Sequence, residues 1–188
     1  MRRALGLILL ALVVVGAAGI YVVRAEPNWY VRMRYPLRYE WILRTHADNY
    51  GLDPALLAAV AYSESKFDPN ATSAAGAIGL MQLLPSTAQG IADHTGGGNY
   101  TPADLYDPEI SIRYGAYYLA RMQRKYRDHP QAIDLALAAY NAGQGNVDRW
   151  VAATPAGQRV RIPFKETRDY IARVHRLQDL YRRAYGLR

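Results

Sequence analysis

Cysteine is absent from this 188-residue chain, which excludes disulfide staples and lipid attachment through an N-terminal cysteine. Strand signals are also missing, because no segment alternates polar and apolar residues for long enough, and no internal repeat is present. The Gly96–Gly98 tract lacks the Lys-Ser or Lys-Thr pair of a phosphate-binding loop. No metal or other cofactor is implied, since the histidines lack ligand spacing: His46, His94, His129 and His175.

The longest apolar stretch is the run from Ala4 to Val23, which contains no charged residue. About 20 such residues are enough to cross a bilayer as a helix, so residues 1–25 are predicted to form a transmembrane anchor. A cleaved secretory signal is the alternative, because Val23-Arg24-Ala25 offers suitable small residues. The run exceeds the roughly 7 to 15 apolar residues usual in a signal, which favours the anchor.

The charges on the two sides of this run leave its orientation open. Arg2 and Arg3 precede it and four arginines follow it, which counts against an outside domain by the positive-inside rule. Large domains cross regardless of nearby charge, so the chemistry has to decide the side. The net charge of +7 favours an anionic polymer as a neighbour, and an exported chain meets wall polymers before nucleic acid. A solvated basic face without any partner explains the charge equally well.

The rest of the chain reads as a short juxtamembrane linker, 26–38, followed by one domain, 39–188. Helical spacing and capping residues predict helices at 39–50, from Pro54 onward behind the N-cap candidate Asp53, and at 86–93, 107–126, 133–140, 147–153 and 166–185. Asn146 is the expected cap of the helix at 147–153. We expect a mainly α fold, a loop from 68 to 85, and at most one short hairpin, near 159–164.

Glu64 stands out within the helix that follows Asp53. It shares a stripe with Leu57, Val60 and Ala61, at positions i, i+3, i+4 and i+7, so its carboxyl is placed toward the core. Burial and the negative end of the helix dipole both raise a carboxyl pKa, which suits a general acid. Position alone also fits a glutamate at the edge of the stripe that reaches solvent or an ion pair.

Four blocks change that balance. They are Glu64-Ser65, the loop from Ser73 to Pro85, the sequence Ala139-Tyr140-Asn141-Ala142-Gly143, and the segment from Ile162 to Tyr170. In this order they resemble the soluble-lytic-transglycosylase (SLT) catalytic domain, over about Tyr39 to Tyr185. The resemblance implies a lysozyme-like helical domain that cleaves the β-1,4 bond between N-acetylmuramic acid and N-acetylglucosamine in peptidoglycan.

The resemblance also implies a mechanism with one carboxyl. Glu64 matches the glutamic acid that protonates the glycosidic oxygen and then, as carboxylate, takes the proton of the muramic C6 hydroxyl, which closes a 1,6-anhydro ring. A nucleophile tethered within the substrate has a high effective concentration, so a second carboxyl is not needed. Asp68, the near acidic neighbour in sequence, fits a turn better than catalysis, and Glu166 is assigned no chemistry.

Substrate-binding residues follow from the same match. Ser73 is expected to bond the acetamido region, Met81 to contact sugar, Gln82 to hydrogen bond near the site, and Tyr140 to lie close to the catalytic carboxyl. The full set expected to bind substrate is Ser73, Gly79, Met81, Gln82, Tyr140, Asn141 and Tyr170.

The expected partners are peptidoglycan glycan strands, the membrane through the N-terminal helix, and a cell-wall protein complex, but no nucleic acid. The expected location is the cell membrane, with a single pass and the domain outside, or secretion after signal cleavage. Two other functions stay open: a goose-type lysozyme-like hydrolase of the same bond, and a glycan-binding or scaffold protein without turnover.

Overall fold

The computed structural model describes residues 2–188, except for the side chains of residues 2–8 and 11. Ten helical elements follow one another in this description: α1 (Arg2–Ala25), α2 (Asn28–Arg34), α3 (Glu40–Tyr50), α4 (Pro54–Ser65), α5 (Pro85–Thr95), η1 (Pro102–Tyr106), α6 (Pro108–Tyr126), α7 (Ala132–Ala142), α8 (Gln144–Ala152) and α9 (Lys165–Tyr185). Between residues 2 and 188 the only β pairing consists of isolated bridges, which join Ile78 to Thr72 and to Leu83. The mainly α prediction is confirmed.

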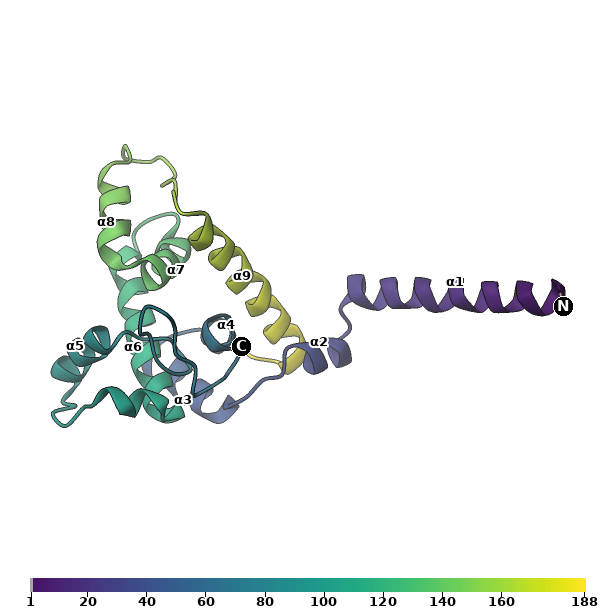
Figure 1. Ribbon diagram of the computed structural model, residues 1–188. Coiled ribbons are helices and arrows are strands. Elements are labelled where there is room, and N and C mark those ends of the chain that lie inside the picture. The colour runs from purple at the N-terminus through teal and green to yellow at the C-terminus, as the bar shows by residue number, and fades with distance from the viewer. Residues whose placement is uncertain (1) are drawn as a thin grey trace.

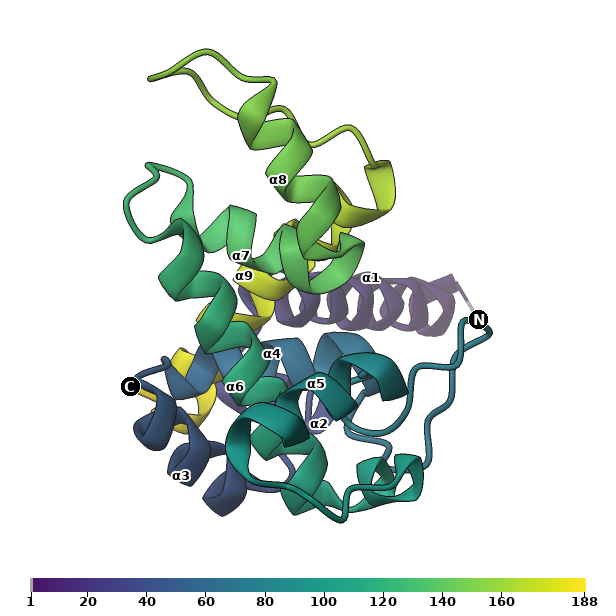
Figure 2. The ribbon, with the colours of Figure 1, turned by 90° about the vertical axis from the view of Figure 1, so that its left-hand side faces the viewer.

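Helix α4 is the centre of the domain. Its residues from Ala55 to Ala61 are all buried, so it is enclosed on every side rather than along one stripe. It packs against α9 and α3, while α6 packs against α7 and α3, and α7 also contacts α8 and α9 (Figure 2). Apolar side chains all round a helix are expected at such a position. The stripe drawn from the sequence therefore understated how far α4 is buried.

Local capping explains where the main helices begin and end. The Asp53 carboxylate accepts a hydrogen bond from the Ala55 N–H at 2.8 Å, and Pro54 occupies the first helical position of α4. The Asp107 carboxylate does the same at the start of α6, for the backbone N–H of Glu109. Gly51 ends α3 in the left-handed conformation. These signals lie within a few residues, so the sequence predicted them correctly.

Two local predictions were wrong. Asn146 does not cap a helix, because α8 already begins at Gln144, and the Asn146 side chain donates to the Ala142 carbonyl instead. The hairpin expected at 159–164 does not form. The backbone N–H of Val160 donates to Oε1 of Gln131, so a buried side chain satisfies this extended segment in place of a partner strand.

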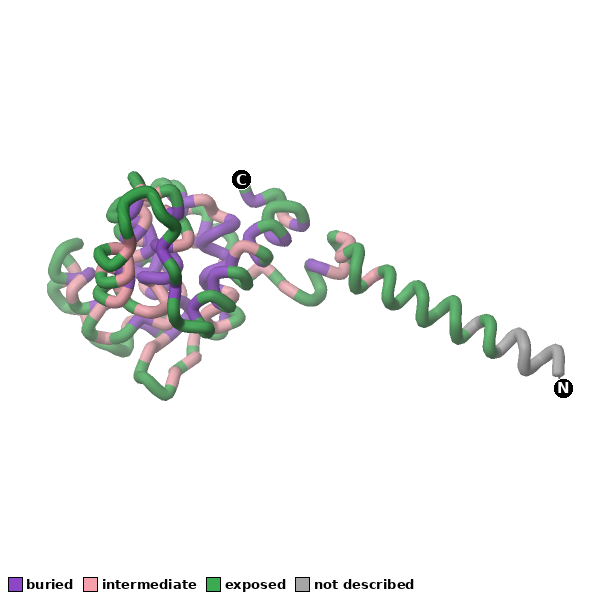
Figure 3. Tube along the Cα trace, turned by 90° about the horizontal axis from the view of Figure 1, so that it is seen from above, coloured by how far each residue is buried: buried purple, intermediate pink, exposed green. Residues whose placement is uncertain are grey.

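Helix α1 extends away from the domain (Figure 1), and its described side chains are almost all exposed (Figure 3). Within the described part of the chain, no helix combines the length and the apolar character needed to cross a bilayer. The predicted anchor, 1–25, includes Met1 and the side chains of residues 2–8 and 11, which lie outside that description. The predicted linker, 26–38, is more than a spacer, since it contains α2, which packs against α9.

Candidate active site

Glu64 is the last residue but one of α4, where the buried helix reaches the surface of the domain. The two residues after the helix, Lys66 and Phe67, both adopt left-handed backbone angles. The Phe67 side chain is fully buried and holds this sharp exit in place. Ser65 donates its hydroxyl to the Leu80 carbonyl at 2.9 Å, which ties the end of α4 to the following loop. Glu64 is thereby fixed between a rigid helix and that loop.

The carboxyl of Glu64 has a strongly raised pKa. Loss of solvent raises its pKa to about 7 from an ordinary value of 4.5, although the neighbouring Tyr170 hydroxyl and the Arg173 guanidinium lower it. The side chain is nevertheless only half-buried, so one side still faces open space. A carboxyl in this state is protonated for a large part of the time near neutral pH and can reach a ligand.

Tyr140 lies near this carboxyl from the end of α7. Its hydroxyl donates a hydrogen bond of 2.8 Å to the Met81 carbonyl. Burial, and then the charge of Glu64, raise the pKa of Tyr140 well above its usual value, so the phenol stays neutral. Because its one proton is directed at Met81, the hydroxyl can only accept a hydrogen bond from another group. A protonated Glu64 could supply such a bond, whereas a carboxylate could not.

A cavity of about 450 Å³ opens in front of these groups. Five of the predicted site residues line it: Glu64, Ser73, Gln82, Tyr140 and Asn141. The remaining lining residues are Ala75, Ala77, Leu83, Leu84, Thr87, Tyr118, Ala142, Gly143 and Glu166. Residues more than 100 positions apart in the sequence thus share one cleft.

Two polar side chains of the loop after α4 present unused hydrogen-bonding groups. The Ser73 hydroxyl accepts from the Ala77 N–H at 3.0 Å, which leaves its own proton free to donate. The Gln82 amide nitrogen donates to the carbonyls of Ala71 and Gly79, at 3.1 and 3.0 Å. Gln82 itself has a left-handed φ of 46°. With the amide NH₂ so engaged, Gln82 Oε1 is available as an acceptor at the cleft.

Gly79 and Met81 do not line this cavity, so the structure does not bring the Met81 side chain to the position where it was expected to contact sugar. The Met81 side chain is fully buried and fills the space over Gly115, where an added Cβ would lie 2.6 Å from it. A Cβ on Gly79 would lie 1.9 Å from the carbonyl oxygen of Leu105. Both residues pack the loop against the rest of the domain, and the Met81 carbonyl accepts the hydrogen bond from the Tyr140 hydroxyl.

Tyr170 is buried close to Glu64 and does not line the cavity. Its ring is buried in α9 and its hydroxyl has no hydrogen-bond partner of normal geometry among the described residues. Burial and the nearby Glu64 raise the pKa of Tyr170 well above its usual value. Asn141, at the cleft, accepts a hydrogen bond of 2.8 Å from the Thr167 hydroxyl, which leaves its amide NH₂ available. Because their pKa values are raised, Tyr140 and Tyr170 both keep neutral hydroxyls beside Glu64.

Among the lining residues that were not predicted from the sequence, three have polar side chains: Thr87, Tyr118 and Glu166. The ring of Tyr118, in α6, lies 5.4 Å from that of Tyr140, centroid to centroid. Glu166, in the first turn of α9, brings a second carboxyl to the same cavity. Asp68, considered as the acidic neighbour from sequence distance, instead accepts from the Asn70 N–H in a turn and does not line the cavity.

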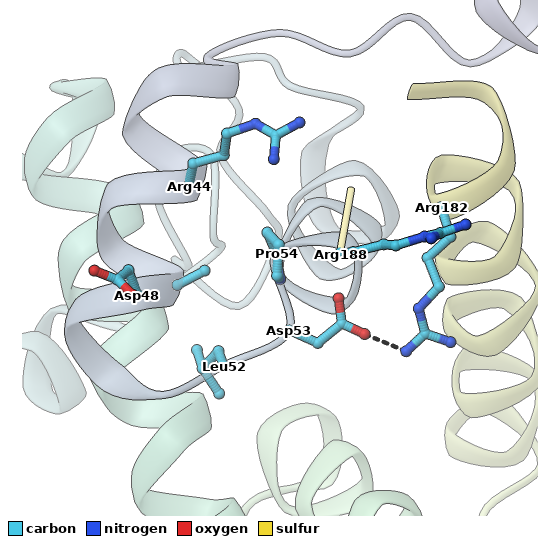
Figure 4. Close-up of a pocket in the computed structure, with 8 residues that line it drawn as sticks. Arg44, Asp48, Leu52, Asp53, Pro54, Arg182 and Arg188 are labelled. Atoms are coloured by element: carbon cyan, nitrogen blue, oxygen red, sulfur yellow. Dashed lines mark hydrogen bonds and ion pairs between the residues drawn. The ribbon is translucent and has the colours of Figure 1, made fainter. Parts of the chain in front are cut away.

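A second cavity, of about 480 Å³, lies between α3, the start of α4 and the end of the chain (Figure 4). Asp53 dominates it. Burial raises the pKa of this carboxyl, but hydrogen bonds from Arg182, Gln178 and the Ala55 N–H outweigh that effect and lower it. The pair of Asp53 and Arg182 joins the first turn of α4 to the last turn of α9 (Figure 4). None of the predicted site residues lies here.

Known proteins resemble the chain in both sequence and fold. The putative soluble lytic murein transglycosylase of Haemophilus influenzae is 34% identical over 150 residues, which are 77% of this chain and 25% of that protein. Membrane-bound lytic murein transglycosylase C of Histophilus somni is 34% identical over 167 residues, 77% of this chain and 46% of that protein. The chain thus spans between a quarter and a half of the length of these relatives.

Among solved structures, an inactive glutamate-to-glutamine mutant of the lytic transglycosylase Slt from Pseudomonas aeruginosa superposes with a TM-score of 0.74 at 31% identity, over 88% of this chain and 27% of that one. A complex of the 70-kDa soluble lytic transglycosylase with bulgecin A gives a TM-score of 0.75 at 30% identity, over 84% and 26% of the two chains. The model of the Transglycosylase SLT domain matches residues 42–161. The chain therefore belongs to the Transglycosylase SLT domain family.

Proposed function

We propose that this chain is a peptidoglycan lytic transglycosylase, with Glu64 as its catalytic group and residues 39–188 as its catalytic domain. The observation that carries the proposal is the carboxyl at the cleft, whose pKa is raised to about 7 by loss of solvent. A group with that pKa can give up a proton and take one back at neutral pH. The relatives named lytic murein transglycosylases support the substrate class.

The reaction proceeds in two proton transfers through one residue. Glu64 first donates its proton to the glycosidic oxygen, and the bond from that oxygen to C1 of the muramic residue breaks. The resulting carboxylate then accepts the proton of the C6 hydroxyl, while the C6 oxygen bonds to C1. The ring closes as a 1,6-anhydro sugar, Glu64 is protonated again, and no water is consumed.

Two tyrosines beside Glu64 act on its two protonation states. Tyr140 offers only an acceptor toward the acid, because its proton is bound to the Met81 carbonyl. Tyr170 offers a buried hydroxyl without another partner among the described residues, and this hydroxyl can donate to the carboxylate formed in the first step. One tyrosine thus stabilises the acid form, and the other stabilises the base form.

Substrate contacts follow from the unused groups around the cavity. The Ser73 hydroxyl proton and the Asn141 amide can donate to sugar carbonyl or hydroxyl oxygens, and Gln82 Oε1 can accept from a hydroxyl or an acetamido N–H. Gly79 and Met81 act through the loop that they support.

A hydrolase is the rival, and one observation favours it. Glu166 lines the same cavity, and an inverting glycosidase uses a second carboxylate to activate water. Glu166 is exposed at the first turn of α9, unlike Glu64. We assign it no chemical step, so Glu166→Gln should retain the product type, whereas a hydrolase would lose its base.

Digestion of purified sacculi, followed by mass analysis of the products, separates the candidates. Anhydro ends, lost in Glu64→Gln and kept in Glu166→Gln, are the expected result. Reducing muramic ends as the main product would show hydrolysis. Binding to sacculi without any release of fragments would show a glycan-binding protein.

We further propose that residues 1–25 anchor the protein in the cell membrane with the domain on the extracytoplasmic side. Between Leu9 and Val23 the described side chains of α1 are uncharged, and nearly all are exposed, which is unfavourable in water for so many large apolar groups. Some relatives are named as membrane-bound. One mass measurement of the mature protein distinguishes the anchor from a cleaved signal.

A further inference from the structure

The segment between α1 and the domain, residues 24–38, has two distinct faces. One face is bound to α9. Val31 is 1% exposed, Arg32 Nε donates to the Ala184 carbonyl at 2.9 Å, and the Tyr185 hydroxyl donates to the Tyr35 carbonyl at 3.0 Å. These contacts hold α2 against the last turns of α9. The two helices are therefore one rigid unit at this end of the domain.

The joint between α1 and α2 is held as well. Arg176 of α9 forms an ion pair with Glu26, just beyond the end of α1, and donates to the Tyr35 hydroxyl at 3.3 Å. Glu26 has a left-handed φ of 43°, and Pro27 follows it, so the chain turns sharply between the helices. The ion pair fixes the direction of that turn relative to α9.

The opposite face of α2 is apolar and uncovered. Trp29 is 59% exposed and Met33 is 68% exposed. At about 100° per residue, these two side chains lie about 40° apart around the helix and about 160° from Val31. A large aromatic and a thioether side chain thus point away from the domain at adjacent turns.

The charges of residues 24–38 that are free of an ion pair with α9 are all positive. Residues 24–38 contain four arginines, and Glu26, their only acidic residue, is bound to Arg176. Arg24, Arg34 and Arg38 are exposed. Tryptophan is favoured at the level of lipid headgroups, and arginine side chains near an anionic leaflet are attracted to it. Apolar and basic groups together fit an anionic bilayer surface better than a protein partner.

We propose that the outer face of α2, Trp29 with Met33, is seated in the headgroup layer of an anionic bilayer, and that α9 holds the cleft at a fixed reach from it. This inference rests on the proposed anchor. Ala184, which binds α2, and Glu166, which lines the cleft, are 18 residues apart on α9, so about 27 Å along its axis. The domain then addresses only glycan within that range of the membrane.

Tryptophan fluorescence of the full chain tests the seating, because the sequence has only three tryptophans. In vesicles of phosphatidylcholine with phosphatidylglycerol, the Trp41→Phe, Trp150→Phe variant reports on Trp29 alone. The matched control, Trp29→Phe with Trp41→Phe, reports on Trp150 in α8, which lies on the side of the domain away from α1 (Figure 1). Both variants should cleave dissolved glycan normally, which verifies the fold.

The expected result is roughly twofold quenching of Trp29 by lipids brominated near the headgroup, as for a side chain at that depth, and none of Trp150. Flotation with the vesicles tests the anchor separately. A chain that floats with Trp29 unquenched overturns the seating and leaves the anchor intact, which would then favour a protein partner for this face. A chain that fails to float overturns both.

Discussion

Replacing Glu64 by glutamine should stabilise the protein at alkaline pH, although it removes the catalytic group. In the folded protein the pKa of this carboxyl is about 7, against an ordinary value of 4.5. The folded state therefore holds a proton that the unfolded chain loses between these two values. Folding stability falls as pH rises through this window, because the unfolded state binds fewer protons.

The size of the effect follows from the pKa difference. One pKa unit corresponds to 1.36 kcal/mol, so a rise from 4.5 to about 7 destabilises the wild type by up to about 3 kcal/mol above pH 7. Because water reaches one side of this half-buried group, we expect a measured value of about 1–3 kcal/mol. Glutamine has nearly the same shape and never ionises, so the variant avoids this destabilisation at alkaline pH.

Urea unfolding of wild type and Glu64→Gln, at about pH 4 and about pH 8.5, measures this difference directly. The two proteins should be similar in stability at the acidic pH, and the variant should be more stable at the alkaline one. All other titrating groups cancel in the comparison. A stability difference that does not change with pH would refute the argument that burial raises this pKa.

Three further perturbations test the surroundings of the acid. Tyr140→Phe removes the hydroxyl that donates to the Met81 carbonyl, so it should lower the free energy of unfolding by about 1–3 kcal/mol and also reduce activity. The matched control is Tyr118→Phe. The Tyr118 hydroxyl bonds to no described residue, so this variant should lose less than about 0.5 kcal/mol. Gly76 and Gly79 both have a left-handed φ, but only at Gly79 would an added Cβ lie 1.9 Å from a carbonyl oxygen. In thermal melting, Gly76→Ala should therefore lower the free energy of unfolding by about 1 kcal/mol, and Gly79→Ala by at least twice that amount. Arg173→Gln removes a positive charge that lowers the pKa of the acid, so the alkaline limb of the activity profile should move to higher pH; a shift to lower pH would contradict that assignment.

The helices were predictable because their signals are local. Asp53 with Pro54 at the start of α4, and Gly51 at the end of α3, lie within one turn of what they cap. The hairpin prediction failed for the opposite reason, since the partner of Val160 is the side chain of Gln131, 29 residues away. Local patterns cannot show such a bond.

The sequence predicted several residues that lie together at the cavity, but not which of the neighbouring side chains are buried beneath it. Glu64, Ser73 and Tyr140 do share a cleft, because the matched blocks preserve which segments meet. Met81 was placed at the sugar because its position in the loop does not reveal which way the side chain points. Its true location depends on the space over Gly115, on another helix. The location of Glu166 at the cavity was missed for the same kind of reason, since only the packing of α9 brings it there.

Digestion of sacculi in ¹⁸O-labelled water tests the central claim most directly, since it asks where the oxygen at the new end of each glycan comes from. If Glu64 acts first as acid and then as base on the C6 hydroxyl, the products are anhydro ends, lighter than the reducing form by one water and free of label. Reducing muramic ends that carry ¹⁸O would show that water is the nucleophile and would contradict the account.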